Sequence, residues 1–476
     1  MSADIRDINE TVKATDTKTV SRAIKAFINN EDNDRGITSN VPIRGHKYFN
    51  RTDVVKALNK IQLSYKPEYI AGSSVNINTK DFKSSLLNTL SSMGSLKTQS
   101  INQIDGRTID FVEMIFGAFL RDRNISPAVK SLLMQLQIPI IKVALLDMKF
   151  FYDPKHLSRK LLDAIAHVGI GIEDRNNTVY QTMEMVVQQL LRSFSENISV
   201  FSTAISSINR LDTIEKQKQA QNEKLTQTQI RQEFARQSVI TELQFQMMGK
   251  TIPKLLQPLI LKHWSTLMYQ RCIKHGKKSK EWNISVNTLR RLINSLQPIN
   301  SEFAWALLNT NQGQIVTTLE KELCSIKQNR ELIFNSIQLL SRTYKKMLDE
   351  SEYKTRKNFN SDEMEKHLDG QDKPNPNEAR EQQARNKLAR LPEYVKPGVW
   401  FELRTDGPNK RRLKLSVIIR EEARLVFVDR LGQKGLEKDA GEFFAELESG
   451  QSSMIADHSI FTAALGEVIT SLAQNK

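Results

Sequence analysis

Four polar residues between positions 147 and 159 have types and spacing that suit acid–base or metal chemistry. His156 and Arg159 are one helical turn apart, and Asp147 and Asp153 precede them. A histidine close to carboxylates can transfer protons or bind a metal ion. A lone histidine with no partner constellation more often has a structural role. We therefore predict that His156 and Arg159 hydrogen-bond across a pair of packed helices.

The two cysteines offer little for a metal site. Cys272 and His275 have the spacing of zinc ligands, but a structural zinc ion takes four ligands, and only Cys324, His263 or distant residues could complete the set. We predict a reduced, half-buried Cys272, no metal and no cofactor. So few cysteines also fit a reducing compartment.

Composition and motifs exclude several classes of protein. The first residues, MSADIRDINE, lack the apolar run of a secretory signal, and no apolar stretch approaches the roughly 20 residues that span a bilayer. Only 19 of the 476 residues are glycine, and there is no P-loop, no G-x-G-x-x-G after a strand, no nucleophile elbow and no H-E-x-x-H. We expect a cytoplasmic protein that is neither inserted in a membrane nor an enzyme.

The densest basic cluster lies in the second half of the chain. Its members are Arg271, Lys274, Lys277, Lys278, Lys280, Arg290 and Arg291. The chain carries a net charge of +15, and residues 391–476 carry −1, so the positive charge belongs to the first 390 residues. Such a cluster could bind RNA, DNA or an acidic protein. Aromatic residues are sparse around it, so we favour a solvated helix end and keep nucleic acid as an alternative.

A predicted hairpin near the C-terminus offers a second candidate site. In the alternating run 412–419 the residues Leu413, Leu415, Val417 and Ile419 share an apolar face, and Phe401 and Leu403 do so in 399–404. The opposite face then carries Trp400, Glu402, Arg404, Arg412, Lys414 and Ser416. We predict that this exposed tryptophan among charges binds an acidic partner or a stacked base. Alternatively, the terminal helix covers Trp400, and Glu402 pairs with Lys414.

Helical periodicity dominates residues 106–350. Ser126 and Pro127 form an N-cap followed by proline at the first helical position, and Asp153–Pro154 repeats that pattern. Pro139 should kink its helix. Consecutive capped, apolar helices predict a solenoid-like stack. Before it, residues 1–105 predict an amphipathic helix over 1–30 and a mostly irregular arm with one docking helix near Val54.

After the helices the sequence changes character twice. Residues 351–390 are charged and almost without large apolar side chains, which predicts an extended linker that is helical at its end at most. In residues 391–476 the spacing of apolar residues falls from 3.6 to 2, which predicts strands over 399–404, 412–419 and 424–428. The turn TDGPNK should join the first two strands. Asp439 and Asp457 should cap two helices. We therefore predict a small β-barrel-like domain, closed by these helices.

Two parts of the chain resemble a known family. They are LLMQLQIPIIKVALLDMKFFYDPKHLSRKLLDAIAHVGIG (132–171) and the tail pattern Gly398-x-Trp400-x-Glu402-Leu403, Arg412-x-Lys414-Leu415, Phe427-Val428-Asp429-Arg430-x-Gly432. The family is large, bacterial and of unknown function, and its members often carry the label "thymidine phosphorylase". The resemblance implies an all-α body with a C-terminal PilZ-like β module. It does not imply the labelled activity, because a pyrimidine phosphorylase needs a glycine-rich phosphate-binding stretch.

The PilZ resemblance raises one specific ligand. PilZ domains that bind cyclic di-GMP use R-x-x-x-R before the module and D/N-x-S-x-x-G on a strand. Here Arg380, Arg385 and Arg390 precede the module at spacings of five, and no D-x-S-x-x-G occurs. The resemblance therefore favours a protein-interaction module and leaves the dinucleotide as an alternative.

These observations predict a non-enzymatic regulatory or scaffold protein that acts through protein–protein docking surfaces. One alternative is a cyclic-dinucleotide effector that binds through the C-terminal module. The other is a nucleic-acid binder that uses the basic helical body.

Overall fold

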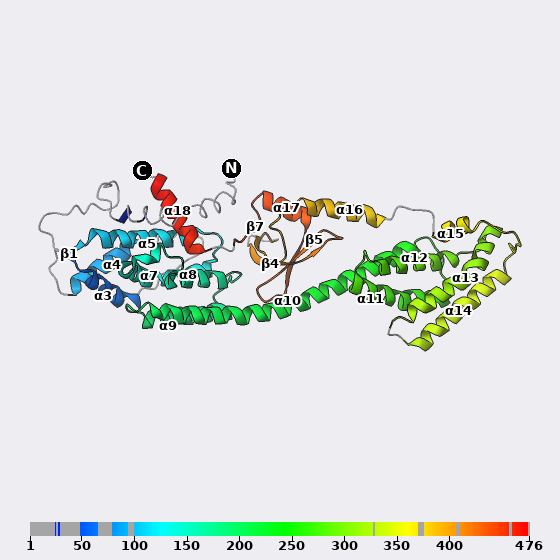
Figure 1. Ribbon diagram of the computed structural model, residues 1–476, viewed down its shortest axis with the longest axis horizontal. Coiled ribbons are helices and arrows are strands. Elements are labelled where there is room, and N and C mark those ends of the chain that lie inside the picture. The colour runs from blue at the N-terminus through cyan, green and yellow to red at the C-terminus, as the bar shows by residue number, and fades with distance from the viewer. Residues whose placement is uncertain are drawn as a thin grey trace. The chain divides into compact units, whose positions relative to one another are not determined.

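The computed structural model describes residues 24, 27, 28, 48–64, 79–93, 100–326, 329–369, 376–405, 410–456 and 459–474. The chain divides into two compact units. Unit 1 consists of residues 1–223, 390–419 and 423–476, and unit 2 of residues 224–389 and 420–422. The chain is mostly helical with a small C-terminal β domain, as predicted (Figure 1). The helix predicted over residues 1–30 lies almost wholly outside the described residues, as do the centre of the TDGPNK turn and Asp457.

The N-terminal helices of unit 1, α3 to α9, surround one large apolar core. The elements are β1 (Tyr48–Phe49), α3 (Arg51–Gln62), α4 (Thr79–Ser92), β2 (Ser100–Ile101), α5 (Gln103–Arg121), α6 (Pro127–Gln135), α7 (Gln137–Leu146), the 3₁₀ turn η1 (Met148–Phe151), α8 (Leu157–Val168), α9 (Thr178–Ser193) and the first part of α10 (Ser199–Met247). The docking helix predicted near Val54 is α3. The prediction of an otherwise irregular arm is wrong for residues 79–92, which form helix α4. Its Phe82, Leu86 and Leu90 recur every four residues and are buried.

The predicted cap and kink around α6 and α7 are present. Ser126 Oγ accepts the N–H of Val129 at 3.3 Å, and Pro127 opens α6. Helices α6 and α7 meet at a 45° bend. The bend falls at Leu136, before Pro139, because a proline clashes with the carbonyl four residues earlier, here that of Gln135, the last residue of α6.

The cap predicted at Asp153 is wrong. Helix α8 begins at Leu157, and its N-cap is His156, whose Nδ1 accepts the N–H of Ser158 at 3.3 Å. Asp153 instead accepts the N–H of Lys155 at 2.8 Å in the preceding turn. His156 caps the helix in place of Asp153 because its buried ring also packs edge-on against Phe150.

A fully buried lysine closes the C-terminal end of α9. Lys142 of α7 donates to the carbonyls of Phe194 and Ser195 at 3.0 Å and to Asn59 Oδ1 at 2.5 Å. A cation suits the negative end of a helix dipole. Burial nevertheless lowers the pKa of Lys142 to about 8, and the charge of Glu196 only partly opposes this shift.

We expect this lysine to make stability depend on pH. Between pH 8 and 10.5 the unfolded chain holds a proton that the folded chain has released, so the free energy of unfolding rises with pH across that window. Urea unfolding at pH 7.5 and pH 10 should show roughly 2–3 kcal/mol more gain for the wild type than for Lys142→Met. Identical gains in the two proteins would contradict a buried, shifted lysine.

Unit 2 begins in the second part of α10 and is helical throughout. Its further elements are η2 (Lys254–Leu256), the π-helical turn η3 (Leu259–Trp264), α11 (Ser265–His275), α12 (Lys280–Ser295), α13 (Glu302–Leu323), α14 (Arg330–Asp349), α15 (Ser361–Asp369) and α16 (Pro376–Ala389). Ser301, the N-cap of α13, accepts the N–H of Ala304 at 3.1 Å. Trp264 is fully buried and donates its indole N–H to the Ser285 carbonyl at 3.1 Å.

Two helices, α15 and α16, occupy much of the segment predicted to be an extended linker. Met364 of α15 is buried, and Phe303 packs edge-on against both Phe359 and His367. These few apolar and aromatic contacts stabilise a segment whose composition alone resembles that of a linker. The prediction of an extended chain is therefore wrong for residues 361–369.

The β module, residues 391–455, has its own small core. Its elements are β3 (Trp400–Leu403), β4 (Arg411–Ile419), β5 (Arg424–Val428), β6 (Lys434–Asp439), α17 (Ala440–Glu448) and β7 (Ser453–Met454). The antiparallel strand order is β6-β5-β4-β3-β7, so the described strands form an open sheet and not a closed barrel. Asp439 caps α17 as predicted, and Phe443 of that helix packs on Phe401 and Phe427.

The last helix, α18 (Ile460–Gln474), does not close the β module. Figure 1 shows it in red beside α5 and α8, and its Phe461, Leu465 and Val468 belong to the core of the N-terminal helices. Asp163 of α8 accepts from Ser459 Oγ at 2.9 Å and from the N–H of Phe461 at 3.2 Å, so it caps α18 from another helix. The prediction that the last helix closes the β domain is therefore wrong.

Among the described residues, no single helix is long and apolar enough to cross a bilayer. The bent pair α6 and α7 reaches that length and composition only when the two helices are taken together.

Candidate functional site

The face of the β module that bears Trp400 lies against the N-terminal helices. Trp400 is half-buried, and its ring lies so close to Gly171, in the turn after α8, that a Cβ there would be 2.8 Å from two ring carbons. Arg430, in the turn after β5, donates to the carbonyl of Val168 and to that of Ile170 at 2.8 Å. Burial lowers the pKa of Arg430. We call this whole contact between module and helices the joint.

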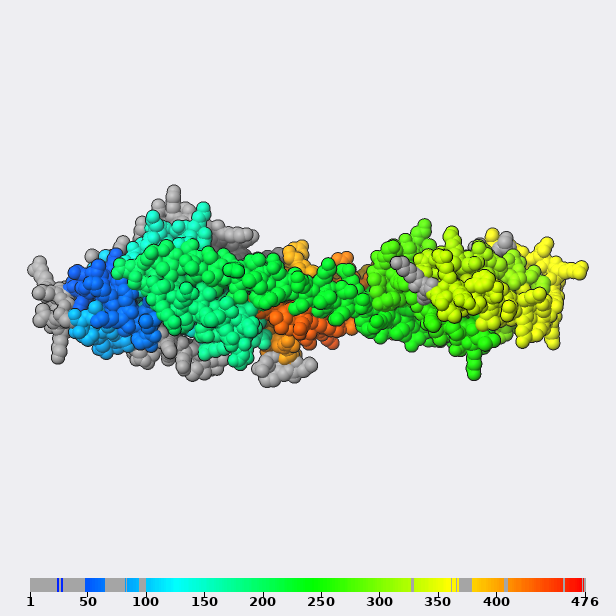
Figure 2. Space-filling model, turned by 90° about the horizontal axis from the view of Figure 1, so that it is seen from below, coloured from blue at the N-terminus to red at the C-terminus, as the bar shows by residue number. Residues whose placement is uncertain are grey.

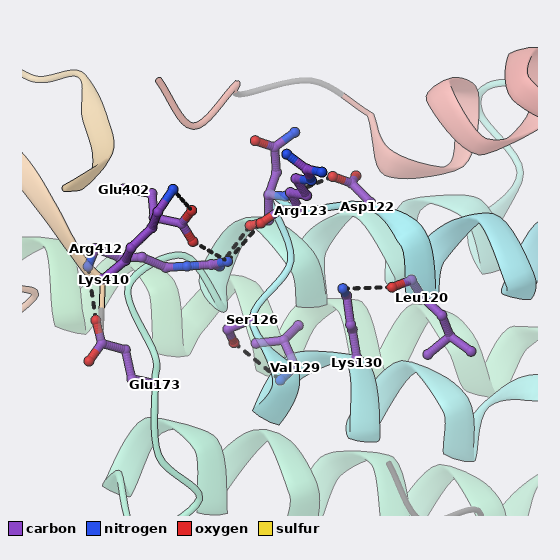
Figure 3. A network of polar contacts seen from close by, with 11 residues as sticks. Leu120, Asp122, Arg123, Ser126, Val129, Lys130, Glu173, Glu402, Lys410 and Arg412 are labelled. Carbon is purple, nitrogen blue, oxygen red and sulfur yellow. Dashed lines mark hydrogen bonds and ion pairs between the residues drawn. The ribbon is translucent and has the colours of Figure 1, made fainter. Parts of the chain in front are cut away.

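Arg412 lies at the centre of the joint. Its guanidinium donates to the carbonyls of Arg123 and Asn124 at 2.7 and 2.8 Å, just beyond the C-terminal end of α5 (Figure 3). Its backbone N–H donates to Glu173 Oε1 at 2.9 Å, and Glu402 lies 3.4 Å from the guanidinium. The side chain is 8% exposed. A planar guanidinium fork suits two adjacent carbonyls, which a lysine could not match.

A second buried cation, Lys130, binds near the C-terminal end of α5. Lys130 of α6 donates to the carbonyl of Leu120 at 2.7 Å (Figure 3). Burial lowers its pKa, and the nearby Arg412 lowers it further, while Asp122 opposes the shift. Cations are favourable at the carbonyl end of a helix. Lys130 therefore binds a carbonyl in the last turn of α5, and Arg412 of the module binds two carbonyls of the loop that follows the helix.

The first part of α10 forms another side of the joint. Lys414 Nζ and Ser416 Oγ donate to the two carboxylate oxygens of Glu223 at 2.5 and 2.8 Å. Gly432 approaches this helix so closely that a Cβ would lie 2.6 Å from the carbonyl oxygen of Gln219. Its φ of +79° also favours glycine. Figure 2 shows the orange module against green α10.

Strand alternation predicted the correct sides as far as Leu415 but did not predict the exposure. Beyond Leu415 the pairing of β4 with β5 shifts in register, and Val417, which was expected in the core, is half-buried. Phe401, Leu403, Leu413 and Leu415 face the module's core, and the polar residues face away from it. The expectation that Trp400, Arg412 and Lys414 are uncovered is wrong, because the N-terminal helices cover them. The expected alternative also differs, since Glu402 pairs with Arg412 and Lys410, not Lys414. Arg404 lies outside the joint and pairs with Gln451 within the module.

Sequence reasoning missed the residues that receive this face. Gly171, Glu173 and Glu223 carry no local signal of binding. On the module itself, Arg430 and Gly432 stand out in the sequence only as part of the family resemblance. The two stretches that carried the resemblance do meet in space, since Trp400 and Arg430 contact residues 168–171. That coincidence is the signal that could have located the joint.

Three domain models of one family match the chain. They are described as the second domain of a protein of unknown function (DUF1631), residues 48–197, its third domain, residues 225–341, and its C-terminal tudor domain, residues 387–455. The chain belongs to the DUF1631 family. No curated protein and no solved structure matches it. The tudor description replaces the expected PilZ-like module, and none of the three descriptions mentions thymidine phosphorylase.

The DUF1631 domain boundaries agree with the contacts of the joint. The tudor match ends at residue 455, before α18, which packs on the N-terminal helices. The match to the second domain covers α3 to α9 and therefore includes Gly171 and Glu173. The joint thus connects two domains of the family within unit 1.

The basic cluster of unit 2 is not one uncovered surface. Arg271 pairs with Glu322 and donates to Ser285 Oγ at 2.8 Å. Lys277 and Lys278 lie 3.5 and 3.6 Å from the carboxylate of Glu381. The other members differ in exposure: Lys274 and Lys280 are exposed, whereas Arg290 and Arg291 are half-buried. Two glutamates, Glu322 and Glu381, therefore contact three of the seven cations.

The arginines expected before the module do not converge. Arg385 lies 3.9 Å from Glu381, and the guanidinium of Arg390 lies over the ring of Phe444 at 5.2 Å. Arg380 lines a shallow hollow of about 360 Å³ beside Phe234 of α10. No pair of these arginines forms a phosphate clamp among the described contacts.

The remaining chemical candidates are held in structural contacts. Arg159 lies over the ring of Phe461 at 4.4 Å and donates to Thr462 Oγ1 at 3.1 Å. Burial lowers the pKa of His156, which lies 3.7 Å from Asp147. Burial raises the pKa of the Cys272 thiol to about 11. Within the described residues, no group of three or more His, Cys, Asp or Glu side chains could hold a metal ion.

Proposed function

We propose that this protein is a non-enzymatic regulatory or scaffold protein that acts by binding protein partners. One observation carries the proposal. The polar side chains that form clusters in unit 1 join segments far apart in sequence, as Arg412 does with residues 123 and 124 and Arg159 with Thr462. Side chains used in this way organise surfaces and do not surround a reacting group.

The test is to isolate the tagged full chain from its own cells and identify the proteins that accompany it. Each candidate is then purified and mixed with the full chain. We expect a stoichiometric complex with at least one partner. The absence of any complex that can be rebuilt from purified proteins would overturn the proposal.

The same preparation tests the two alternative functions. Calorimetry with cyclic di-GMP tests the effector function, with Arg380→Ala as the matched variant. Anisotropy with labelled RNA and DNA between 50 and 200 mM salt tests nucleic-acid binding, for which affinity should fall steeply with salt. We expect neither ligand to bind; saturable binding of either one, lost in the matched variant or in high salt, would replace our proposal.

A further inference from the structure

We propose that the β module undocks from the N-terminal helices and that its uncovered joint face then binds an acidic segment of a partner protein. This inference rests on the proposed function and names the surface and the chemistry of the partner. The joint face is the set Trp400, Arg412, Lys414, Ser416, Arg430 and Gly432.

The first argument is that module and helices have separate cores. The apolar cluster of the N-terminal helices includes α18 but, among the described residues, none from 390–455. The module buries its own Phe401, Phe427 and Phe443. Domain contacts without a shared apolar core resemble those of transient complexes. Undocking therefore leaves both apolar cores closed, and the ring of Trp400 is the large apolar group that it uncovers.

The second argument is the chemistry of the joint. Apart from the close approaches of Gly171 to Trp400 and of Gly432 to α10, its specific contacts are ion pairs and hydrogen bonds. Both partners of the Lys414–Glu223 pair keep about 15% of their side chains exposed. Separated charges at such a surface regain water, so separation costs less than it would in a sealed core. Salt should weaken the docked state for the same reason.

The third argument defines the partner. In the docked state the joint face is met by two glutamates, Glu173 and Glu223, and by backbone carbonyls. Lys414 and Ser416 together bind both oxygens of the Glu223 carboxylate. The ring of Trp400 lies against Gly171, and Arg430 binds the carbonyls on either side of Gly169. A competing segment needs the same features, a glutamate and a nearby glycine in an acidic peptide. Residues 168–177 of this chain, VGIGIEDRNN, supply such a probe.

Gly432 offers a variant that separates docking from folding. Alanine at this position would clash with the backbone of α10, whereas alanine at Gly398, whose φ is +98°, meets nothing within 4 Å. Both variants place a side chain at a left-handed φ, so Gly398→Ala is the matched control for strain. Gly171→Ala opposes docking from the other side, because its Cβ would meet the ring of Trp400.

The test uses the full chain and hydrogen exchange of segments 166–176 and 399–404. We expect Gly432→Ala and Gly171→Ala to raise exchange at both segments at least tenfold over Gly398→Ala. We also expect the peptide 168–177 to bind Gly432→Ala at least tenfold more tightly than wild type. Replacing its glutamate with glutamine, or adding Arg430→Ala to the protein, should abolish that gain, because Arg430 binds two carbonyls of this segment in the docked state.

Three outcomes would overturn the inference. Exchange equal to that of Gly398→Ala in both variants would show that the module does not undock. Undocking without peptide binding would remove the assigned partner, and so would binding of a 15-residue uridine oligonucleotide in place of the peptide. In each case a partner complex of the wild-type chain could still stand, so the proposed function fails only by its own test.

Discussion

Replacing Ile140 with aspartate is expected to unfold the N-terminal helices of unit 1. Ile140 is 0% exposed, and every residue of α7 from Gln137 to Leu145 is buried. An unpaired carboxylate in such a place costs more than about 4 kcal/mol, which approaches the total stability of many domains. Thermal unfolding of the purified variant should show loss of the unit 1 transition, and much of the protein should be insoluble.

Two variants serve as controls for this prediction. Ile140→Val removes one methylene from the same site and should cost about 0.5–1.5 kcal/mol. Lys277→Glu changes charge at a partly solvated side chain that pairs with Glu381 in unit 2, and should change stability by about 1 kcal/mol or less. A midpoint for Ile140→Asp that matches Lys277→Glu would show that α7 is not the centre of this core.

Local sequence signals predicted helix caps and bends correctly where the residues that form them lie in one short segment. The Ser126 cap needs only the N–H of Val129, and the bend near Pro139 needs only the carbonyl of Gln135. The Asp153 cap failed because burial of His156 against Phe150 outweighed a local preference. The prediction of an extended chain over residues 361–369 is wrong for a similar reason. Its composition is that of a linker, and the contact with Phe303 comes from a residue outside the segment.

The candidate site shows the limit of such signals more clearly. The alternation of apolar and polar residues predicted which side of β4 carries Arg412 and Lys414, because the side of a strand on which a residue lies repeats every two residues. It could not tell what covers that side, since Arg412 meets a residue 288 positions away and Lys414 one 191 positions away. The charges of this face are typical of a solvent-exposed surface. The guanidinium partners of Arg412 and Arg430 across the joint are backbone carbonyls, which every residue has, so no sequence pattern marks them.

The same limit explains the misplaced C-terminal helix. Its apolar stripe predicted that one side is buried, and Phe461, Leu465 and Val468 are buried. The apolar stripe does not specify which core the helix packs against, and the β module is only the core that is nearest in sequence. The structure places α18 with α5 and α8, where Phe150 packs against Phe461 with ring centroids 4.8 Å apart.

We therefore expect Phe461→Ala to destabilise the N-terminal helices and not the β module. Phe461 is 0% exposed, packs against Phe150 and stacks under the guanidinium of Arg159. Truncating a buried phenylalanine costs about 3–5 kcal/mol. Thr470→Ala, at an exposed position of the same helix, should change stability by about 0.5 kcal/mol or less.

Hydrogen exchange resolved by segment decides where the loss falls. With Phe461→Ala, protection should fall in α5 and α8, while β4 and β5 keep theirs, because the module's core consists of its own residues. Phe443→Ala, which removes an aromatic ring from that core, should give the reverse pattern. If Phe461→Ala instead lowers protection in β4 and β5 and spares α8, the last helix closes the module after all, and the sequence-based placement was correct.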